Sequence, residues 1–425
     1  MSGRPTPLVF ALAAVAAAAL LGAVVIDRLE LVVMAFPLLA AILLGRKDRD
    51  AARFTLTHEL SAERTTEGEP LGVRVTITAL SALPSIEILY RLPAMTALAS
   101  GSHRRVLSLA EGESETWIFE IRCLARGRTE LGRLHFRVWD TIGLSVAEGR
   151  HDAPKRISVY PAATPIRYLP RPRRTRSSFG NHVSSKLGQG LEPGDIRPYG
   201  AGDLLRQINW RASLRLGRLY VTQFHEERNA DVVLLLDTTA DIGVRPESSL
   251  DHCVKAAAAL ATGYLRHRDR VGLITYGGNI QWIRPRAGRR QIETLLEALL
   301  PASMAANYSF QDLEVLPPRV LPPGALVIAL SPLIDPRFVK VVANLAGRGF
   351  DVLLLALSPL ELMRPFTGRA PLDDLTARLW TLNRRATLDA LHEVGLPAVE
   401  LHPGTPLDAA LAPLARVGRP RAVRR

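Results

Sequence analysis

The sequence predicts a chain of several domains: an N-terminal transmembrane helical hairpin, an antiparallel β sandwich, and a doubly wound, Rossmann-like α/β domain. Three observations predict this order. Two apolar runs open the chain, short alternating runs separated by turns follow, and strand patterns alternate with helix patterns from about residue 231. At 425 residues the chain is also too long for one ordinary domain.

The domain boundaries are placed where these patterns change. They are a membrane hairpin of two transmembrane helices at 1–50, a β sandwich at 51–165, a basic linker with a signature segment at 166–227, an α/β domain at 228–418 and a basic tail at 419–425. Part of the net charge of +13 lies in runs at 46–49, 167–176 and 416–425. Such runs suit an anionic membrane or an acidic partner. Nucleic acid is not expected, because no zinc knuckle, RNP-like run or helix-turn-helix pattern accompanies the charge.

The first apolar run, Leu8 to Ile26, is uncharged and long enough to cross a bilayer core of roughly 30 Å. A charged break follows, then a shorter run from Leu31 to Leu44 that contains Pro37. The alternatives are a cleaved signal peptide for the first run and a buried hairpin for the second. Basic residues flank the pair on its outer sides, so the positive-inside rule predicts a protein of the cytoplasmic membrane with both termini and its soluble domains in the cytoplasm. The two cysteines, Cys123 and Cys253, fall in different domains and are expected to be buried and free.

The β-rich segment 51–165 ends in three short motifs. They are Arg-Gly-Arg-Thr-Glu-Leu-Gly-Arg-Leu at 126–134, Asp-Thr-Ile-Gly-Leu at 140–144 and Val-Tyr-Pro at 159–161. Hairpin chemistry alone could account for their glycines, which permit turns and bulges. Together the motifs resemble the domain-of-unknown-function 58 family, in which a strand beginning Arg-Gly leads to an Asp-x-x-Gly-Leu turn and a Val-Tyr-Pro strand end.

The segment 188–213 carries the most specific pattern in the chain, and it is similar to the hallmark of the same family. Its candidate residues are Glu192, Arg197, Tyr199, Asp203, Arg206, Trp210, Arg211 and Ser213. The favoured interpretation is a charge-assisted clamp that holds an irregular linker on the α/β domain, with Trp210 filling a gap. The alternative is an interface anchored by Trp210. A nucleotide loop at Gly188-x-Gly190 is rejected, since no strand is predicted before it and Pro193 follows.

Asp237 ends the first predicted strand of the α/β domain, and Thr239 and Asp241 follow it. This order is similar to the Asp-x-Ser-x-Ser of von Willebrand A domains, whose oxygens hold a divalent cation such as Mg²⁺. The remaining ligand positions look incomplete. Arg289 or Arg290 stands where a Thr is expected, and Ser331 and Pro332 stand where an Asp is expected. The sequence therefore predicts a degenerate site that binds Mg²⁺ weakly or not at all.

The resemblance implies a membrane-anchored, non-enzymatic scaffold, because the family is commonly encoded beside AAA+ ATPases of the MoxR type. The expected function is an adaptor for such an ATPase in the assembly or maturation of other proteins. Two alternatives stay open. One is a metal-dependent hydrolase of the haloacid dehalogenase type that uses Asp237, and the other is a basic nucleic-acid-binding protein.

Overall fold

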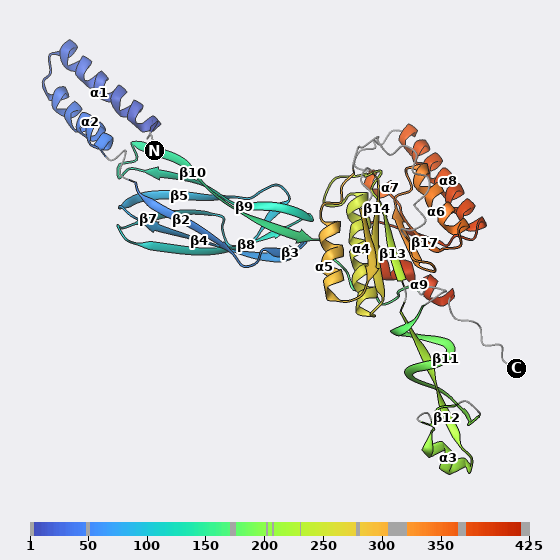
Figure 1. Cartoon of the computed structure of the whole chain (residues 1–425). Coiled ribbons are helices and arrows are strands. Elements are labelled where there is room, and N and C mark those ends of the chain that lie inside the picture. The colour runs from blue at the N-terminus through green and yellow to red at the C-terminus, as the bar shows by residue number, and fades with distance from the viewer. Residues whose placement is uncertain are drawn as a thin grey trace. The chain divides into compact units, whose positions relative to one another are not determined.

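The structure is a computed structural model that describes residues 4–47, 52–170, 176–200, 203–205, 208–229, 231–277, 281–304, 321–363 and 371–417. Within these ranges it does not describe the side chains of residues 44–47, 176–195, 223–229, 371–372 and 415–417. The chain divides into two compact units, Met1–Tyr160 and Pro161–Arg425. Figure 1 labels most of the elements of each unit.

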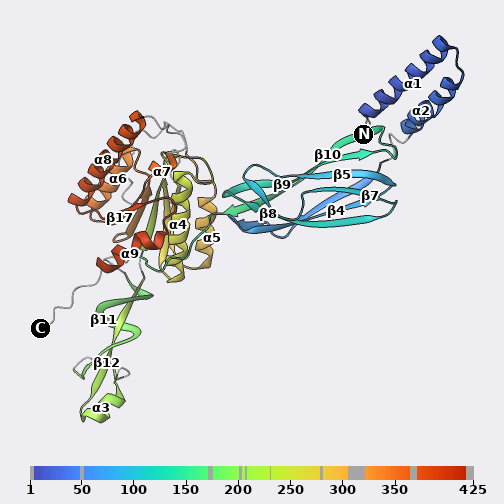
Figure 2. The same ribbon diagram turned by 180° about the vertical axis from the view of Figure 1, so that it is seen from behind.

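Two helices open the first unit, α1 (Pro7–Ile26) and α2 (Glu30–Lys47). By length and composition α1 could cross a membrane, as an anchor or as a signal sequence, whereas α2 has a shorter apolar stretch, Glu30–Leu43. The helices lie side by side (Figures 1 and 2). Ala16 and Ala35 are buried, while many of the larger apolar side chains of both helices are exposed. Small residues at a helix contact surrounded by exposed apolar side chains are typical of helices in lipid.

The rest of the first unit consists of two sheets that share one core. Its strands are β1 (Arg4–Pro5), β2 (Phe54–Leu60), β3 (Arg64–Thr66), β4 (Pro70–Ala79), β5 (Leu83–Arg91), β6 (Thr96–Ser100), β7 (Arg104–Leu109), β8 (Ser114–Cys123), β9 (Gly127–Trp139) and β10 (Ser145–Tyr160). One sheet has the order β1-β10-β9-β5-β7, with β3 also paired to β10, and the other has the order β2-β4-β8-β6. Tyr90 and Phe119 meet edge to face between the sheets, with ring centroids 5.3 Å apart. The sheet-rich N-terminal region that the sequence predicts is confirmed.

The second unit contains a six-stranded sheet between two layers of helices. Its strands are β13 (Asp231–Asp237), β14 (Arg270–Tyr276), β15 (Gln281–Arg286), β16 (Leu326–Ser331), β17 (Asp351–Leu357) and β18 (Ala398–Leu401). The helices are α4 (Ser249–Arg266), α5 (Arg289–Leu299), α6 (Pro336–Gly347), α7 (Leu360–Met363), α8 (Pro371–Glu393) and α9 (Leu407–Val417).

The order of this sheet is β15-β14-β13-β16-β17-β18, with all strands parallel except the edge strand β15. Alternate residues of β13 face opposite cores. Leu234 belongs to the core that includes residues of α4, α5 and α9, and Leu235 belongs to the core that includes residues of α6 and α8. Burial on both faces explains the unbroken apolar run of β13. Because parallel strands end at one edge of the sheet, Asp237, Tyr276 and Ser331 are brought to the same edge.

The signature segment adopts a regular structure that the sequence analysis did not predict. An irregular linker was expected there, but β11 (Arg176–Pro198) pairs antiparallel with β12 (Tyr220–Asn229), and the helix α3 (Trp210–Leu216) lies between them in sequence. The pairing shifts register at four places. Bulges of this kind accommodate the glycines and prolines of β11, which mask the alternating pattern of a strand. Gly188 and Gly190 therefore lie within a strand and not in a nucleotide-binding loop.

Candidate functional site

Asp237 is the centre of the candidate site at the carboxyl edge of the sheet, and its side chain is 0% exposed. One carboxylate oxygen accepts hydrogen bonds from the backbone N–H of Thr239 at 2.9 Å and from the Thr239 hydroxyl at 2.6 Å. The other oxygen accepts a hydrogen bond from the Ser331 hydroxyl at 2.5 Å. The Ser331 hydroxyl in turn accepts from the backbone N–H of Leu333 at 2.8 Å. Two neighbouring strands thus direct hydroxyl groups to one carboxylate.

Burial raises the pKa of Asp237 to about 6, although the hydrogen bonds from Ser331 and Thr239 favour the charged form. The charge of Asp335 adds to the increase. A carboxyl group with this pKa changes its protonation near neutral pH. Its two hydroxyl partners also keep free lone pairs that could face a hard cation.

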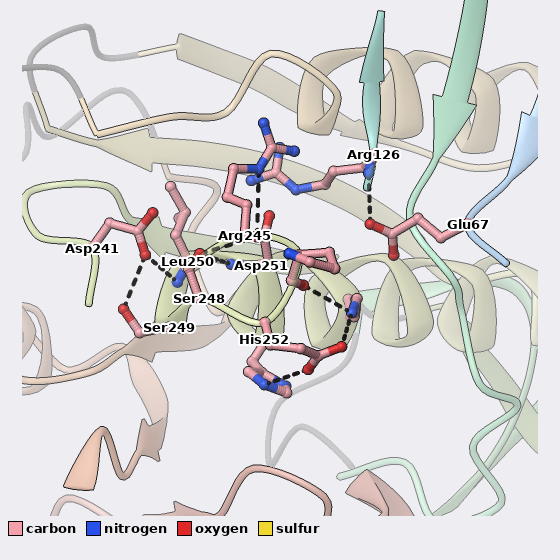
Figure 3. Close-up of polar contacts among 12 residues, drawn as sticks. Glu67, Arg126, Asp241, Arg245, Ser248, Ser249, Leu250, Asp251 and His252 are labelled. Carbon is pink, nitrogen blue, oxygen red and sulfur yellow. Dashed lines mark hydrogen bonds and ion pairs between the residues drawn. The ribbon is translucent and has the colours of Figure 1, made fainter. Parts of the chain in front are cut away.

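The structure joins Asp237 to Thr239 but gives Asp241 different partners. Asp241 accepts hydrogen bonds from the Ser249 hydroxyl at 3.2 Å and from the backbone N–H of Leu250 at 2.9 Å (Figure 3). A carboxylate at the start of α4 stabilises the free N–H groups and the helix dipole there. Among the residues that the structure describes, no group of three or more His, Cys, Asp or Glu could hold a metal ion.

The loop between β13 and α4 is held by further polar contacts within this unit. Ser248 caps α4 by accepting from the backbone N–H of Asp251 at 3.2 Å, and its hydroxyl lies 3.1 Å from the Asp251 carboxylate. Arg245 lies 3.5 Å from the same buried carboxylate (Figure 3). The backbone of Ile242 also bonds to Ser249 through both its N–H and its carbonyl group. The loop that follows Asp237 is therefore tied to the first turn of α4.

Arg289 and Arg290 lie away from Asp237, which corrects the expectation that one of them occupies a ligand position. They open α5 directly after β15, and Arg286 at the end of β15 pairs with Val271 near the beginning of β14. Because β15 runs antiparallel, this end is the amino edge of the parallel strands, opposite to the edge that holds Asp237. The order of motifs in the sequence suggested that Arg289 or Arg290 lies near Asp237. The antiparallel direction of β15 places both arginines at the opposite edge of the sheet. Residues 278–280, which follow β14 in the sequence, and residues 305–320, which precede β16, lie outside the described residues.

Arg384 is a residue of this edge that the sequence analysis did not identify. It extends from α8, is buried, and donates at 2.7 Å to the carbonyl groups of both Pro332 and Leu357. Its Nε also donates to Glu400 of β18 at 2.8 Å. One guanidinium group therefore links the ends of β16 and β17 to β18. A second arginine, Arg385, stands next to Arg384 in the sequence. Only the helical periodicity of α8 could have indicated which of the two arginines is buried.

Asp335 is also at this edge, as the N-cap of α6. It accepts from the backbone N–H of Arg337 at 2.9 Å and pairs with the Arg337 guanidinium at 2.6 Å. The Arg337 side chain holds the pKa of Asp335 below its usual value. Asp335 therefore has a cationic partner in place of the metal that it would meet in a complete site.

The second group of candidate residues lies in the last part of β11 and in the segment that connects it to β12. Arg197 and Asp203 form a bidentate ion pair at 2.8 and 2.6 Å, and Asp203 also accepts from the backbone N–H of Gly200 at 2.8 Å. The Tyr199 hydroxyl lies 3.4 Å from the carbonyl oxygen of Asp203. These contacts close the turn after β11. The Glu192 side chain and the whole of Arg206 lie outside the described residues.

The start of α3 is attached to β12 through Asn209 and Ser213. Asn209 caps the helix by accepting from the backbone N–H of Ala212 at 3.0 Å, and its amide group donates to Thr222 at 3.0 Å. The buried Ser213 hydroxyl donates to the Asn209 carbonyl and accepts from the backbone N–H of Tyr220, both at 2.8 Å. The signature serine thus acts within the segment itself.

Trp210 does not fill a gap. Its side chain is 63% exposed, and Leu214, one helical turn later, is 85% exposed. Large apolar residues on both sides of α3 are exposed too, and basic residues lie among them. We define the α3 surface as Leu204, Leu205, Trp210, Arg211, Leu214, Arg215, Leu216, Arg218 and Leu219. Exposed apolar patches are uncommon on soluble proteins and mark interaction surfaces, and this concentration of exposed large apolar residues suggests such a surface.

Comparison with known proteins finds a match to a family model, and the matched residues lie within the second unit. Residues 195–389 match the family model described as "Protein of unknown function DUF58". This range holds the α3 surface and Asp237 and its partners. Uncharacterized proteins of Mycobacterium tuberculosis and Mycobacterium bovis are 26% identical to the chain over 202 residues. The match covers 46% of this chain and 64% of the length of those relatives.

Solved structures that resemble parts of the chain do so only distantly. Alpha-2-macroglobulin from Escherichia coli matches with a TM-score of 0.23 and 19% identity, covering 36% of this chain and 21% of that one. A CARDB domain from Pyrococcus furiosus matches with a TM-score of 0.18 and 12% identity, covering 26% of this chain and 94% of that one. Neither likeness bears on function.

Proposed function

We propose that the protein is a non-enzymatic scaffold, anchored in the cytoplasmic membrane, that recruits an AAA+ ATPase of the MoxR type to the assembly or maturation of other proteins. The anchor is the helical pair α1 and α2, and the soluble units lie in the cytoplasm. The ATPase docks on the α3 surface. Its identity as a MoxR-type ATPase rests on the resemblance of the signature segment to a family commonly encoded beside such enzymes.

The exposed α3 surface carries this proposal. Trp210 and Leu214 are separated by one helical turn, so they present one apolar anchor on a support that Asn209 and Ser213 attach to β12. Arg211, Arg215 and Arg218 surround it with positive charge. The chemistry that fits is an apolar pocket with an acidic rim, since interfaces combine buried aromatic anchors with complementary charges.

The α/β domain supports a von Willebrand A-like assignment. Its strands alternate with helices and its first strand lies inside the sheet, between β14 and β16. Asp237 ends that strand and Thr239 follows it, as at the first two positions of the Asp-x-Ser-x-Ser pattern. In this proposal the loop after Asp237 serves as a rigid, shaped surface and Mg²⁺ binding is weak.

The hydrolase alternative is weaker. An aspartyl nucleophile needs an oxygen that faces its substrate. Both carboxylate oxygens of Asp237 instead accept hydrogen bonds from Thr239 and Ser331, and the side chain is enclosed. The nucleic-acid alternative rests on arginine runs whose side chains lie largely outside the described residues.

Replacement of Trp210 tests the proposal. The full chain in lipid nanodiscs would be titrated with the MoxR-type ATPase of its own organism. We expect Trp210→Ala to weaken binding by about 2 kcal/mol, roughly 30-fold, which is the scale of an interface hot spot. The melting temperature should not change, because the indole is mostly exposed.

Trp282→Ala is the matched control for this experiment. Trp282 is also an exposed tryptophan beside an arginine, with the Arg284 guanidinium 4.9 Å from its ring centre, but it lies on β15. Its replacement should leave ATPase binding unchanged. Equal binding by the wild type and Trp210→Ala would exclude the α3 surface as the docking site. Loss of binding in proportion to a lowered melting temperature would favour the clamp interpretation of Trp210.

A further inference from the structure

Both ends of the helical pair are bonded to the same end of the β domain. Before α1, Thr6 donates from its backbone N–H to the Leu144 carbonyl at 2.9 Å and from its hydroxyl to the Gly143 carbonyl at 2.9 Å. After α2, Arg53 accepts from the backbone N–H of Leu80 at 2.8 Å and donates its own N–H to the Ser81 hydroxyl at 2.9 Å. The turn 140–144 therefore adjoins the start of α1, and the turn 80–82 adjoins Arg53, the second residue described after α2.

The chain between these bonds and the apolar part of α1 is very short. Leu8, the first residue of the apolar run, comes two residues after Thr6, so the Leu144 carbonyl cannot lie much more than about 10 Å from it, given about 3.5 Å per extended residue plus one hydrogen bond. The headgroup layer of one leaflet is roughly 5–8 Å thick. If α1 crosses the bilayer, the turn 140–144 must lie within that layer or within a few ångströms (about 2–5 Å) of it.

Exposed apolar side chains stand on both of these turns. Leu80 is 53% exposed and Ile142 is 46% exposed. Exposure alone does not single out this end, because Met95 at the other end of β5 is 42% exposed. What distinguishes the two ends is the attachment of α1 and α2.

Among the described residues, charges of both signs lie at this end, so attraction to anionic lipid is not required. Arg4 and Arg53 are exposed there. Glu111 and Glu113 lie on the turn 110–113, which the Gly112 N–H attaches to the Ala79 carbonyl at 2.9 Å. Contact with lipid would therefore depend on the apolar side chains.

We propose that the turns 80–82 and 140–144 form a lipid-contacting surface that places Leu80 and Ile142 in the headgroup region of the membrane. This inference rests on the proposed anchoring through α1. It adds that the β domain is held against the bilayer and is not suspended from a flexible tether. The partner is the zwitterionic lipid surface itself.

Fluorescence quenching by lipid-attached nitroxides tests this surface. The full chain would be reconstituted in phosphatidylcholine nanodiscs after labelling single cysteines with a polarity-sensitive dye at Leu80→Cys, Ile142→Cys or Met95→Cys. Cys123 and Cys253 are buried, so the unmodified chain serves as the labelling blank. A fourth label, at Val24→Cys in α1, reports membrane insertion independently. All four positions are exposed, so the substitutions leave the core unchanged.

We expect headgroup-level nitroxides to quench the labels at positions 80 and 142 by at least about twofold and to leave the label at 95 unquenched. The label at 24 lies near the far end of the apolar run of α1, so it should be quenched by nitroxides on the upper part of the acyl chains. Quenching at 24 with positions 80 and 142 no more quenched than 95 would overturn the lipid-contacting surface and leave the anchor intact. An unquenched label at 24 would reject the anchor itself, and the surface with it.

Discussion

At the scale of single residues, Asp237 shows how burial decides what a carboxylate can do. Sequence position marked it as a possible metal ligand, yet its two oxygens are occupied by Thr239 and Ser331 and its pKa is raised to about 6. The folded-state pKa lies above the unfolded value of 3.8. The neutral form is thus the one that folding favours, and the stabilisation it brings is present below about pH 4 and lost as the pH rises through 6.

This sign leads to a prediction for Asp237→Asn. A shift from 3.8 to about 6 corresponds to about 3 kcal/mol of ionisation cost in the folded state at pH 7.5, by 1.36 kcal/mol per unit. An uncharged asparagine avoids this cost but no longer accepts the Ser331 hydrogen. We therefore expect the free energy of unfolding to rise by about 2 kcal/mol at pH 7.5 and not to rise at pH 4.

Hydrogen exchange of the β13 and β16 amides in the full chain would measure this change without assuming two-state unfolding of all domains. Asp335→Asn is the control, because its partner Arg337 lowers the pKa of Asp335 and ionisation is favourable there. It should bring no gain at pH 7.5. A gain from Asp237→Asn that is the same at both pH values would show that burial does not raise the pKa of this carboxyl above its unfolded value.

At the scale of elements, β9 contains a glycine that the sequence analysis identified as part of a motif but whose role it did not explain. Gly132 has a φ of +110°, and a Cβ at this position would meet the Ala153 carbonyl and the Nε2 of His58. His58 is buried on β2, its Nε2 donates to the Ala153 carbonyl at 2.6 Å, and burial lowers its pKa. The glycine of the Leu-Gly motif thus makes room for a buried histidine that bonds to β10.

Gly132→Ala should therefore destabilise the β domain by about 3 kcal/mol, because backbone strain adds to the overlap with His58. Gly68→Ala is a suitable control, since Gly68 also has a positive φ, +79°, but nothing lies within 4 Å of its Cβ position. Its cost should stay near 1 kcal/mol. Hydrogen exchange of β2 and β9 in the full chain would compare the two variants. Equal losses of stability in the two variants would mean that Gly132 is needed only for its positive φ, and not to make room for His58.

At the scale of the whole molecule, the pairing of β1 with β10 bears on membrane topology. Arg4 pairs with Val146 and Pro5 with Ser145, so the segment before α1 belongs to the same folded domain as the segment after α2. A single crossing would place these two segments on opposite sides of the membrane and prevent the pairing. If α1 crosses, α2 must return, even though its apolar stretch is short and contains Pro37.

Reporter fusions at residue 28 and at residue 425 test this topology. We expect the reporter at residue 28, between the two helices, to be on the external side and the one at 425 to be in the cytoplasm, because basic residues flank the pair on its outer sides. A Pro5→Gly variant serves as a control, because it leaves unchanged the flanking basic residues that are expected to set the orientation. Both reporters on one side of the membrane would contradict two crossings.

The sequence alone was sufficient where a pattern is local and repeats. The apolar run of α1, the alternation in β4 and β8, and the unbroken apolar strand β13 report their burial directly, because each side chain's environment follows from its position in one element. The two cysteines were correctly expected to be buried and free, because they fall in different domains. The signature residues were identified as a set, but their partners were not.

The tertiary structure decided which residues meet. In the structure, the Ser331 hydroxyl donates a hydrogen bond to Asp237, and Arg289 and Arg290 lie at the opposite edge of the sheet. Arg384 is buried at the strand ends, and Trp210 is exposed. Each of these outcomes depends on strand direction or on which face of a helix is covered. Those are properties of contacts between elements distant in sequence, and a periodicity within one element carries no record of them.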